Sequence, residues 1–208
     1  MMGSKEYFKD VASQWDTMRK GFFSDDIREK ACSVANVQGG KVAADIGAGT
    51  GFLSEALLNH GLKVIAVDNS KEMLDQMEKK FGAARNIDYR LGDSEKLPID
   101  DETVDYAMAN MVLHHVENPL TAIEEMARIL KPGGKLVITD LDEHNHEFLR
   151  TEQHDRWMGF KREEVKNWFT KAGLKNVTVD CAGGNCCSES KCGCDSASIS
   201  IFVACGEK

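Results

Sequence analysis

The feature that most constrains the fold is the segment of residues 42–52, VAADIGAGTGF, in which an apolar run leads directly into alternating glycines. The apolar run predicts a buried strand, and residues 53–58 have the pattern of a helix. A glycine-rich turn at the carboxyl end of a buried strand lets a ligand approach the backbone more closely than any side chain would allow. We therefore expect an α/β fold that binds a nucleoside-containing cofactor at this turn, with a tight structural connection as the alternative.

The glycine spacing and one acidic residue narrow the choice of cofactor. The dinucleotide fingerprint G-x-G-x-x-G requires its third glycine at the position of Phe52, whereas this loop has Gly47, Gly49 and Gly51. Asp45 opens the turn, where its carboxylate would repel a pyrophosphate but attract the ammonium and sulfonium groups of S-adenosylmethionine. The methionine carboxylate would then bind to backbone N–H groups at the start of the helix. The charge pattern therefore favours a cofactor that carries positive charge.

Two more acidic residues follow predicted strands further along the chain. Asp68 ends the apolar run of residues 63–67, at about the distance beyond the glycines where a doubly wound fold places an acid on the ribose hydroxyls. The alternative is that Asp68 caps a helix beginning near Ser70. Asp93 follows a third predicted strand, residues 87–91, at the same edge of the sheet. We expect its carboxylate to accept a hydrogen bond from an adenine amino group.

Five motifs occur in order along the chain: DIGAGTG, VDNS, GDSEKLP, NMVLHHV and LKPGGKLVITD. Together they resemble the class I S-adenosylmethionine-dependent methyltransferases, especially the small ubiquinone-biosynthesis-type branch, over roughly residues 42–140. The resemblance implies an α/β fold with a doubly wound, Rossmann-like seven-stranded sheet that is mostly parallel, with an antiparallel last strand. A weaker likeness, carried by Trp-x-Gly-Phe at residues 157–160, is to methyltransferase domains linked to arsenic-type repressors.

The resemblance also implies which residues bind S-adenosylmethionine. In the family, the residues matching Asp45, Gly47 and Gly49 line the methionine part of the cofactor. The residue matching Asp68 binds ribose, and the one matching Met73 packs on adenine. The complete implied set is Asp45, Gly47, Ala48, Gly49, Asp68, Asn69, Met73, Asp93, Ser94 and Asn110.

We expect one domain, residues 1–208, because 42% hydrophobic residues suffice for a sizeable core in a chain of this length. It divides into an N-terminal helical cap (1–38), a cofactor-binding core (42–140), a substrate-side lid (143–160) and a Cys-rich loop (181–197). Residues 131–134, Lys-Pro-Gly-Gly, predict the end of a helix and a turn into the fifth strand. Strands are expected at 42–46, 63–67, 87–91, 104–110, 135–140, 174–181 and 198–204, with helices between them.

Net charge and hydropathy limit the classes of partner that the protein can have. A net charge of -8 without a Lys/Arg block argues against a nucleic-acid partner, because phosphate binding depends on clustered cations. No apolar run approaches the roughly 18 to 20 residues that span a bilayer, and the polar start lacks a signal-peptide core. We therefore expect a cytoplasmic protein that acts on a small-molecule or metalloid substrate, with its oligomeric state open.

Five of the seven cysteines lie in or beside the predicted loop between the last two strands. If strand six runs parallel to the first five, this loop borders the cofactor-binding edge. Clustered thiolates suit a soft ion such as arsenic(III), mercury(II), copper(I) or zinc(II). The spacing differs from the usual Cys-x-x-Cys zinc motif, so a redox-active or disulfide-closed loop and incidental thiols are alternatives. The candidate metal ligands are Cys186, Cys187, Cys192 and Cys194.

His114 and His115 follow the predicted fourth strand, whose end borders the transferred methyl, and they are the candidate catalytic residues. Packing or orientation of a loop is the alternative role. A thiolate, selenide or arsenic lone pair needs no proton removed, whereas an oxygen or carbon acid would require a histidine base. We expect in-line transfer of a methyl group from S-adenosylmethionine to a small acceptor, with a soft thiol, selenium or arsenic nucleophile as one option. The alternative is a non-catalytic protein that senses metal or S-adenosylmethionine on the same fold.

Overall fold

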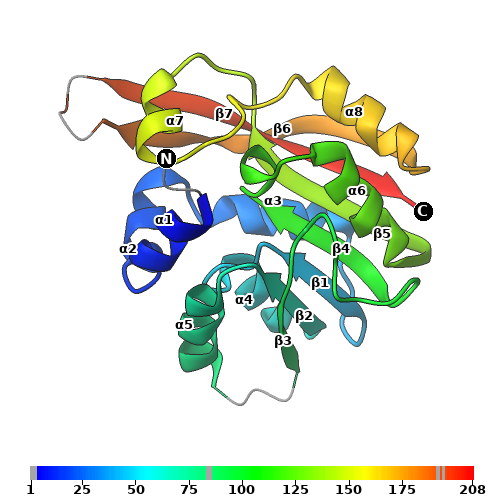
Figure 1. Ribbon diagram of the computed structural model, residues 1–208. Helices are drawn as coiled ribbons and strands as arrows, with labels where there is room; N and C mark the ends of the chain where they lie inside the picture. The colour runs from blue at the N-terminus through cyan, green and yellow to red at the C-terminus, as the bar shows by residue number, and fades with distance from the viewer. Residues whose placement is uncertain (1–3, 83–85, 191–192, 194) are drawn as a thin grey trace.

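The computed structural model describes residues 4–82, 86–190, 193 and 195–208, and within them the chain forms a seven-stranded sheet with helices on both faces (Figure 1). The strand order is β3-β2-β1-β4-β5-β7-β6. The first five strands pair in parallel, and β7 is antiparallel to both β5 and β6, so β6 runs parallel to the first five. This topology confirms the predicted doubly wound fold with an antiparallel last strand.

The strands are β1 (Val42–Ile46), β2 (Lys63–Asp68), β3 (Ile87–Leu91), β4 (Val104–Asn110), β5 (Leu130–Leu141), β6 (Lys175–Glu189) and β7 (Ser196–Glu207). The helices are α1 (Ser4–Val11), α2 (Trp15–Phe22), α3 (Asp26–Ala35), α4 (Phe52–Asn59), α5 (Lys71–Phe81), α6 (Pro119–Arg128), α7 (Glu147–Glu152) and α8 (Arg162–Lys171), with a short 3₁₀ turn, η1 (Leu113–His115). In the described residues, no helix has both the length and the apolar character needed to cross a membrane.

The core consists of two layers, one on each face of the sheet. Successive residues of a strand face opposite sides, so Ala43 of β1 packs toward α3 and α4, whereas Ala44 and Ile46 pack toward α6 and α8. Both faces of the central strands are therefore covered, which is why their sequences are almost continuously apolar. The carboxyl ends of these strands remain available for a ligand.

Strand β5 begins at Leu130, five residues earlier than expected. Leu130 pairs with Val104 and Lys135 pairs with Tyr106, so the Lys-Pro-Gly-Gly segment forms a bulge between two paired positions. Gly133 has φ of +77°, a conformation that favours glycine. Residues 131–134 therefore form a bulge near the start of β5 and do not end the helix. Helix α6 ends earlier, at Arg128.

Strands β6 and β7 are longer than expected, and this corrects the predicted Cys-rich loop. Residues 182–189 belong to β6, and β7 begins at Ser196. Two extra residues are accommodated between Cys181 and Asn185, where Gly183 has φ of +90°. The sequence predicted a strand end at residue 181, but Gly183 and Gly184 form a bulge within the strand because residues 196–200 continue the pairing. Figure 1 shows the resulting ribbon extending past the other strands beside α7.

Candidate functional site

The turn after β1 has a backbone that requires glycine. Gly47, Gly49 and Gly51 have φ of +68°, +53° and +90°. A Cβ atom at Gly47 would collide with the side chain of Val112, so a substitution there meets both strain and a steric clash. The backbone N–H of Gly49 donates a 2.8 Å hydrogen bond to Oδ2 of Asp68. The turn is thus held against the ends of its two neighbouring strands.

A cavity of about 350 Å³ opens beside this turn, at the carboxyl ends of β1, β2 and β4. Residues of α1 and α2 close its other side. The structure brings together at its wall all ten residues of the predicted cofactor set: Asp45, Gly47, Ala48, Gly49, Asp68, Asn69, Met73, Asp93, Ser94 and Asn110.

Asp45 is the most deeply buried acid at this cavity, with 2% of its surface exposed. Its Oδ2 accepts a 2.6 Å hydrogen bond from the Ser54 hydroxyl of α4. Burial raises the pKa of Asp45 to about 7, an effect that the Ser54 hydrogen bond opposes and the charge of Asp68 increases. A cation in the cavity would favour the ionised form, because it would offset the desolvation of this carboxylate.

Asp68 connects the glycine turn to the start of α5. In addition to the Gly49 hydrogen bond, its Oδ1 accepts a 2.8 Å hydrogen bond from the Ser70 backbone. The N-cap of α5 is Ser70, whose hydroxyl accepts from the Met73 backbone at 3.3 Å. The alternative role of Asp68 as the helix cap is therefore wrong. Asp68 also lines the cavity, where its carboxylate faces the ligand space.

The loop after β3 forms another part of the wall. Asp93 is exposed, and its Oδ1 accepts from the Glu95 backbone at 2.9 Å. Glu95 in turn accepts from the backbones of Glu117 and Asn118, at 2.8 and 3.1 Å. These bonds tie the loop to the segment that follows β4. Across the cavity, Asn110 accepts a 2.8 Å hydrogen bond from the Thr139 hydroxyl, which sets the orientation of its amide.

The cavity also contains a buried cation that the sequence analysis missed, Arg19 of α2. Only 6% of its surface is exposed, and its guanidinium lies 4.0 Å from the centre of the Phe52 ring. Nη2 pairs with Asp25 at 3.1 Å, whereas Nε and Nη1 are buried without a hydrogen-bond partner among the described residues. A buried guanidinium with unused donors is suited to an anion. The sequence pattern that could have predicted this burial is the helical spacing of Arg19 four residues from both Trp15 and Phe23.

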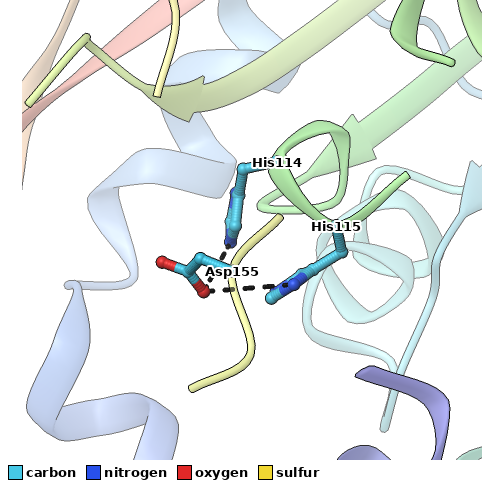
Figure 2. A group of neighbouring side chains, drawn as sticks. All are labelled: His114, His115 and Asp155. Carbon is cyan, nitrogen blue, oxygen red and sulfur yellow. Dashed lines mark ion pairs between the residues drawn. The ribbon is translucent and has the colours of Figure 1, made fainter. Parts of the chain in front are cut away.

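The two candidate catalytic histidines have different environments. His114 lies outside the cavity wall, and its Nδ1 forms a 2.6 Å hydrogen bond with Oδ1 of Asp140, which is fully buried. His115 lines the cavity, and its ring lies 5.0 Å from that of Phe8 in α1. Asp155 approaches both histidines from the segment after α7 (Figure 2). Of the two histidines, His115 is therefore the one that can touch a molecule in the cavity.

Electrostatics separate the two histidines further. Burial lowers the pKa of His114, but Asp140 and Asp155 outweigh it and raise this pKa to about 9. Burial and the neighbouring His114 hold the pKa of His115 well below its ordinary value. At neutral pH and without a metal, His114 is a charged partner of two carboxylates, and His115 is a neutral hydrogen-bonding group.

The cysteines of the predicted metal set are not brought together in the part of the chain that the structure describes. Cys186 and Cys187 are neighbours in β6, so their side chains face opposite sides of the strand. Cys186 is half-buried, and burial with the charge of Asp155 raises the pKa of its thiol to about 12. Cys187 is exposed, with its sulfur 3.8 Å from the Ser198 hydroxyl. Cys192 and Cys194 lie outside the described residues.

Comparison with known proteins adds independent information. A family model described as "Methyltransferase domain" matches residues 44–138. A relative in Coxiella burnetii, named ubiquinone biosynthesis O-methyltransferase, is 28% identical over 190 residues, which cover 83% of this chain and 81% of that protein. An uncharacterized methyltransferase of Mycobacterium bovis is 44% identical over 92 residues, which are 44% of this chain and 36% of the relative.

Solved structures match the fold over most of the chain. The methyltransferase in complex with the Trm112 activator of Haloferax volcanii superposes with a TM-score of 0.79 at 20% identity, over 96% of both chains. A Haemonchus contortus phosphoethanolamine N-methyltransferase, solved with phosphomonomethylethanolamine and S-adenosylhomocysteine, superposes with a TM-score of 0.71 at 17% identity. That match covers 86% of this chain and 52% of the other. At these identities the likeness establishes the fold.

Proposed function

We propose that the chain is a class I S-adenosylmethionine-dependent methyltransferase and that it methylates a small acceptor that enters the cavity beside His115. The observation that carries this proposal is the cavity at the glycine turn, where the buried Asp45 faces the space that the cofactor would fill. The methyltransferase family and the methyltransferase-named relatives favour an enzyme over a protein that only senses its ligand.

We assign the parts of S-adenosylmethionine by charge and position. Asp45 faces the positive methionine part, and Asp68 accepts hydrogen bonds from the ribose hydroxyls. Met73, 2% exposed, packs on adenine, with Asp93 at the adenine edge. Arg19 offers its two unused donor nitrogens to the methionine carboxylate, beside the N-terminus of α4. Each charge of the cofactor then meets an opposite charge in a cavity with little water, where the attraction is strong.

The reaction we propose is an in-line displacement. A lone pair of the acceptor forms a bond to the methyl carbon while the carbon–sulfur bond breaks, and the electron pair of that bond remains on the sulfur of S-adenosylhomocysteine. Because the sulfonium is an activated leaving group, alignment of the two reactants carries most of the rate enhancement, up to about 7 to 11 kcal/mol. The residues around the cavity act mainly by holding the cofactor and excluding water.

The environment of His115 bears on the acceptor. A neutral imidazole with a strongly lowered pKa is a weak base, although it still accepts a hydrogen bond. This favours an acceptor whose nucleophilic atom needs no proton removed, such as a thiolate, a selenide or trivalent arsenic. The second candidate is a hydroxyl acceptor, which is favoured by the name of the ubiquinone biosynthesis O-methyltransferase relative.

Calorimetry tests the cofactor assignment. S-adenosylmethionine should bind the parent protein, and Asp68→Ala should weaken binding at least tenfold because two ribose hydrogen bonds are lost. Asp100→Ala is the matched control, since Asp100 is an exposed acid outside the cavity wall. Equal affinities in the parent and the Asp68 variant would contradict the ribose assignment.

The acceptor is identified by transfer of a labelled methyl group. The panel contains arsenite, selenide, small thiols and hydroxylated aromatic quinol precursors, with products separated by chromatography. Product from a soft nucleophile supports the first candidate, and product from a hydroxyl supports the second. Tight cofactor binding without product from any acceptor would favour the sensing alternative.

A further inference from the structure

We propose that His114, His115 and Asp155 form a binding site for a divalent transition-metal ion of the Zn²⁺ class beside the cavity, which His115 lines. The site stands on its own geometry, and a role for the ion in the reaction rests on the proposed function. It differs from the metal site that the sequence predicted, because its ligands are imidazole nitrogens and a carboxylate.

The three side chains offer ligand atoms that lie within 4.8 Å of one another (Figure 2). Asp155 Oδ1 is 3.8 Å from His114 Nε2 and 4.0 Å from His115 Nδ1. These distances are too long for hydrogen bonds. Zinc bonds of about 2.0 to 2.2 Å place tetrahedral ligand atoms roughly 3.3 Å apart, so the two Asp155 edges would shorten by about 0.5 to 0.7 Å and the edge between the imidazole nitrogens by at most about 1.5 Å. Two nitrogens and one oxygen are the ligand types of catalytic zinc sites.

His114 is oriented as a metal ligand by a second carboxylate. Its Nδ1 is engaged by Asp140, which leaves Nε2 directed toward Asp155. Asp140 is itself held by the backbones of Leu113 and Leu141, at 2.8 and 2.7 Å. A carboxylate on the far nitrogen of a ligating histidine is the usual outer-shell arrangement, since it sets the ring orientation and makes the metal-binding nitrogen more basic.

His115 provides a second, independent indication. Its Nδ1 is buried and has no hydrogen-bond partner among the described residues. The ring is engaged by the backbone of His154 instead, and it packs against Phe8. An unpaired buried nitrogen loses hydration without compensation, so a buried polar atom normally has a partner. This nitrogen faces the Asp155 carboxylate, the position from which an ion would satisfy it.

The chain positions Asp155 by an unusual local backbone. His154 has φ of +62°, and the backbone N–H groups of Arg156 and Trp157 both donate to the His114 carbonyl at 3.0 Å. These bonds fix Asp155 over the histidines, where 4% of its surface is exposed. With Asp140, two buried carboxylates lie beside the site, and their charge favours a cation there.

His115 is the ligand that lines the cavity, so a coordination position left open on the ion would lie on the side of the cavity. A hydroxyl or thiol of the acceptor fits this position, and its proton would leave to solvent as the oxygen or sulfur binds the ion. Cys186 lies near enough to Asp155 for their charges to interact, so the experiment must test it as a competing ligand.

The experiment measures binding of Zn²⁺ by calorimetry and of Co²⁺ by visible absorption, with tag-free protein. We expect one ion per chain, and at least a tenfold loss of affinity in Asp155→Asn and in His115→Phe. Phenylalanine keeps the ring contact with Phe8 while removing both nitrogens. Circular dichroism and melting curves confirm that each variant folds, and Asp155→Asn, which preserves shape, remains informative if the other does not.

Two controls distinguish this site from other metal-binding groups. His60→Ala removes a surface imidazole, and the double variant Cys186→Ser, Cys187→Ser removes two adjacent thiols of β6. Both should bind Zn²⁺ like the parent. The proposal is overturned if the parent binds no Zn²⁺. It is also overturned if the serine variant loses the ion while Asp155→Asn retains it. S-adenosylmethionine affinity, measured on the same samples, reports separately on the proposed function.

Discussion

Replacement of Asp45 by asparagine should stabilise the cofactor-free protein while weakening its cofactor binding. Asp45 is 2% exposed, and burial raises its pKa from an ordinary value of 3.8 to about 7. For an acid whose pKa is raised by folding, the native state holds the proton more tightly than the unfolded state. Stability is therefore lost as pH rises from about 4 to 7, and the full penalty is present above 7.

The shift sets the size of the effect. Three pH units, at about 1.4 kcal/mol each, give a penalty of roughly 4 kcal/mol at pH 8 and less than half of that at pH 5. Asparagine keeps an acceptor for the Ser54 hydroxyl but carries no charge. The amide N–H groups of asparagine are additional buried donors, so the stabilisation should be smaller than this roughly 4 kcal/mol. We expect the Asp45→Asn variant to melt several degrees above the parent at pH 8, with a smaller difference at pH 5.

Cofactor binding should respond in the opposite direction. In the parent, S-adenosylmethionine affinity should fall about tenfold between pH 8 and pH 6, because binding requires an ionised Asp45 whose pKa is about 7. The variant should bind at least tenfold more weakly at pH 8 and show no such pH dependence. Thermal melts and calorimetry at pH 5, 6, 7 and 8 measure both effects. A variant less stable than the parent at pH 8, or a parent affinity that is flat across this range, would refute the reasoning.

Two further predictions follow from the cavity. Arg19→Met, which preserves much of the aliphatic volume, should reduce the affinity for S-adenosylmethionine tenfold or more, measured by calorimetry. The affinity for decarboxylated S-adenosylmethionine should fall far less. Equal losses for the two ligands would contradict the assignment of Arg19 to the methionine carboxylate. Gly47→Ala should lower the free energy of unfolding by about 1 to 3 kcal/mol, measured in urea, and weaken cofactor binding, because φ is +68° and the added Cβ would meet Val112. Gly133→Ala is the control: its Cβ would meet open space, so cofactor binding should stay unchanged.

Much of the cavity wall was predictable from the sequence because its residues directly follow the strands. Asp45, Asp68 and Asp93 each stand at or just after the carboxyl end of a predicted strand. Parallel strands place these ends along one edge, so a local sequence pattern determines a shared location. The strand topology was implied by the resemblance to class I methyltransferases, and it agrees with the parallel crossovers that helices between apolar strands impose.

The prediction from the sequence was wrong where the local strand propensity disagrees with the strand pairing in the fold. The sequence predicted a Cys-rich loop at residues 181–197, and the Gly183–Gly184 pair within it has low strand propensity. Residues 185–189 nevertheless pair with 196–200 and form a long ribbon. Consequently Cys186 and Cys187 face opposite sides of one strand and do not converge on an ion, an arrangement that spacing alone does not reveal.

By itself, the sequence determined the fold, the glycine turn and the acids at the edge of the sheet, because those features arise within single strand-turn-helix units. Only the tertiary structure decided which histidine faces the cavity, that Arg19 is buried against Phe52, and that Asp155 reaches both histidines. These contacts join segments far apart in the chain. They depend on how α1, α2 and the segment after α7 pack over the sheet, and no local pattern encodes that packing.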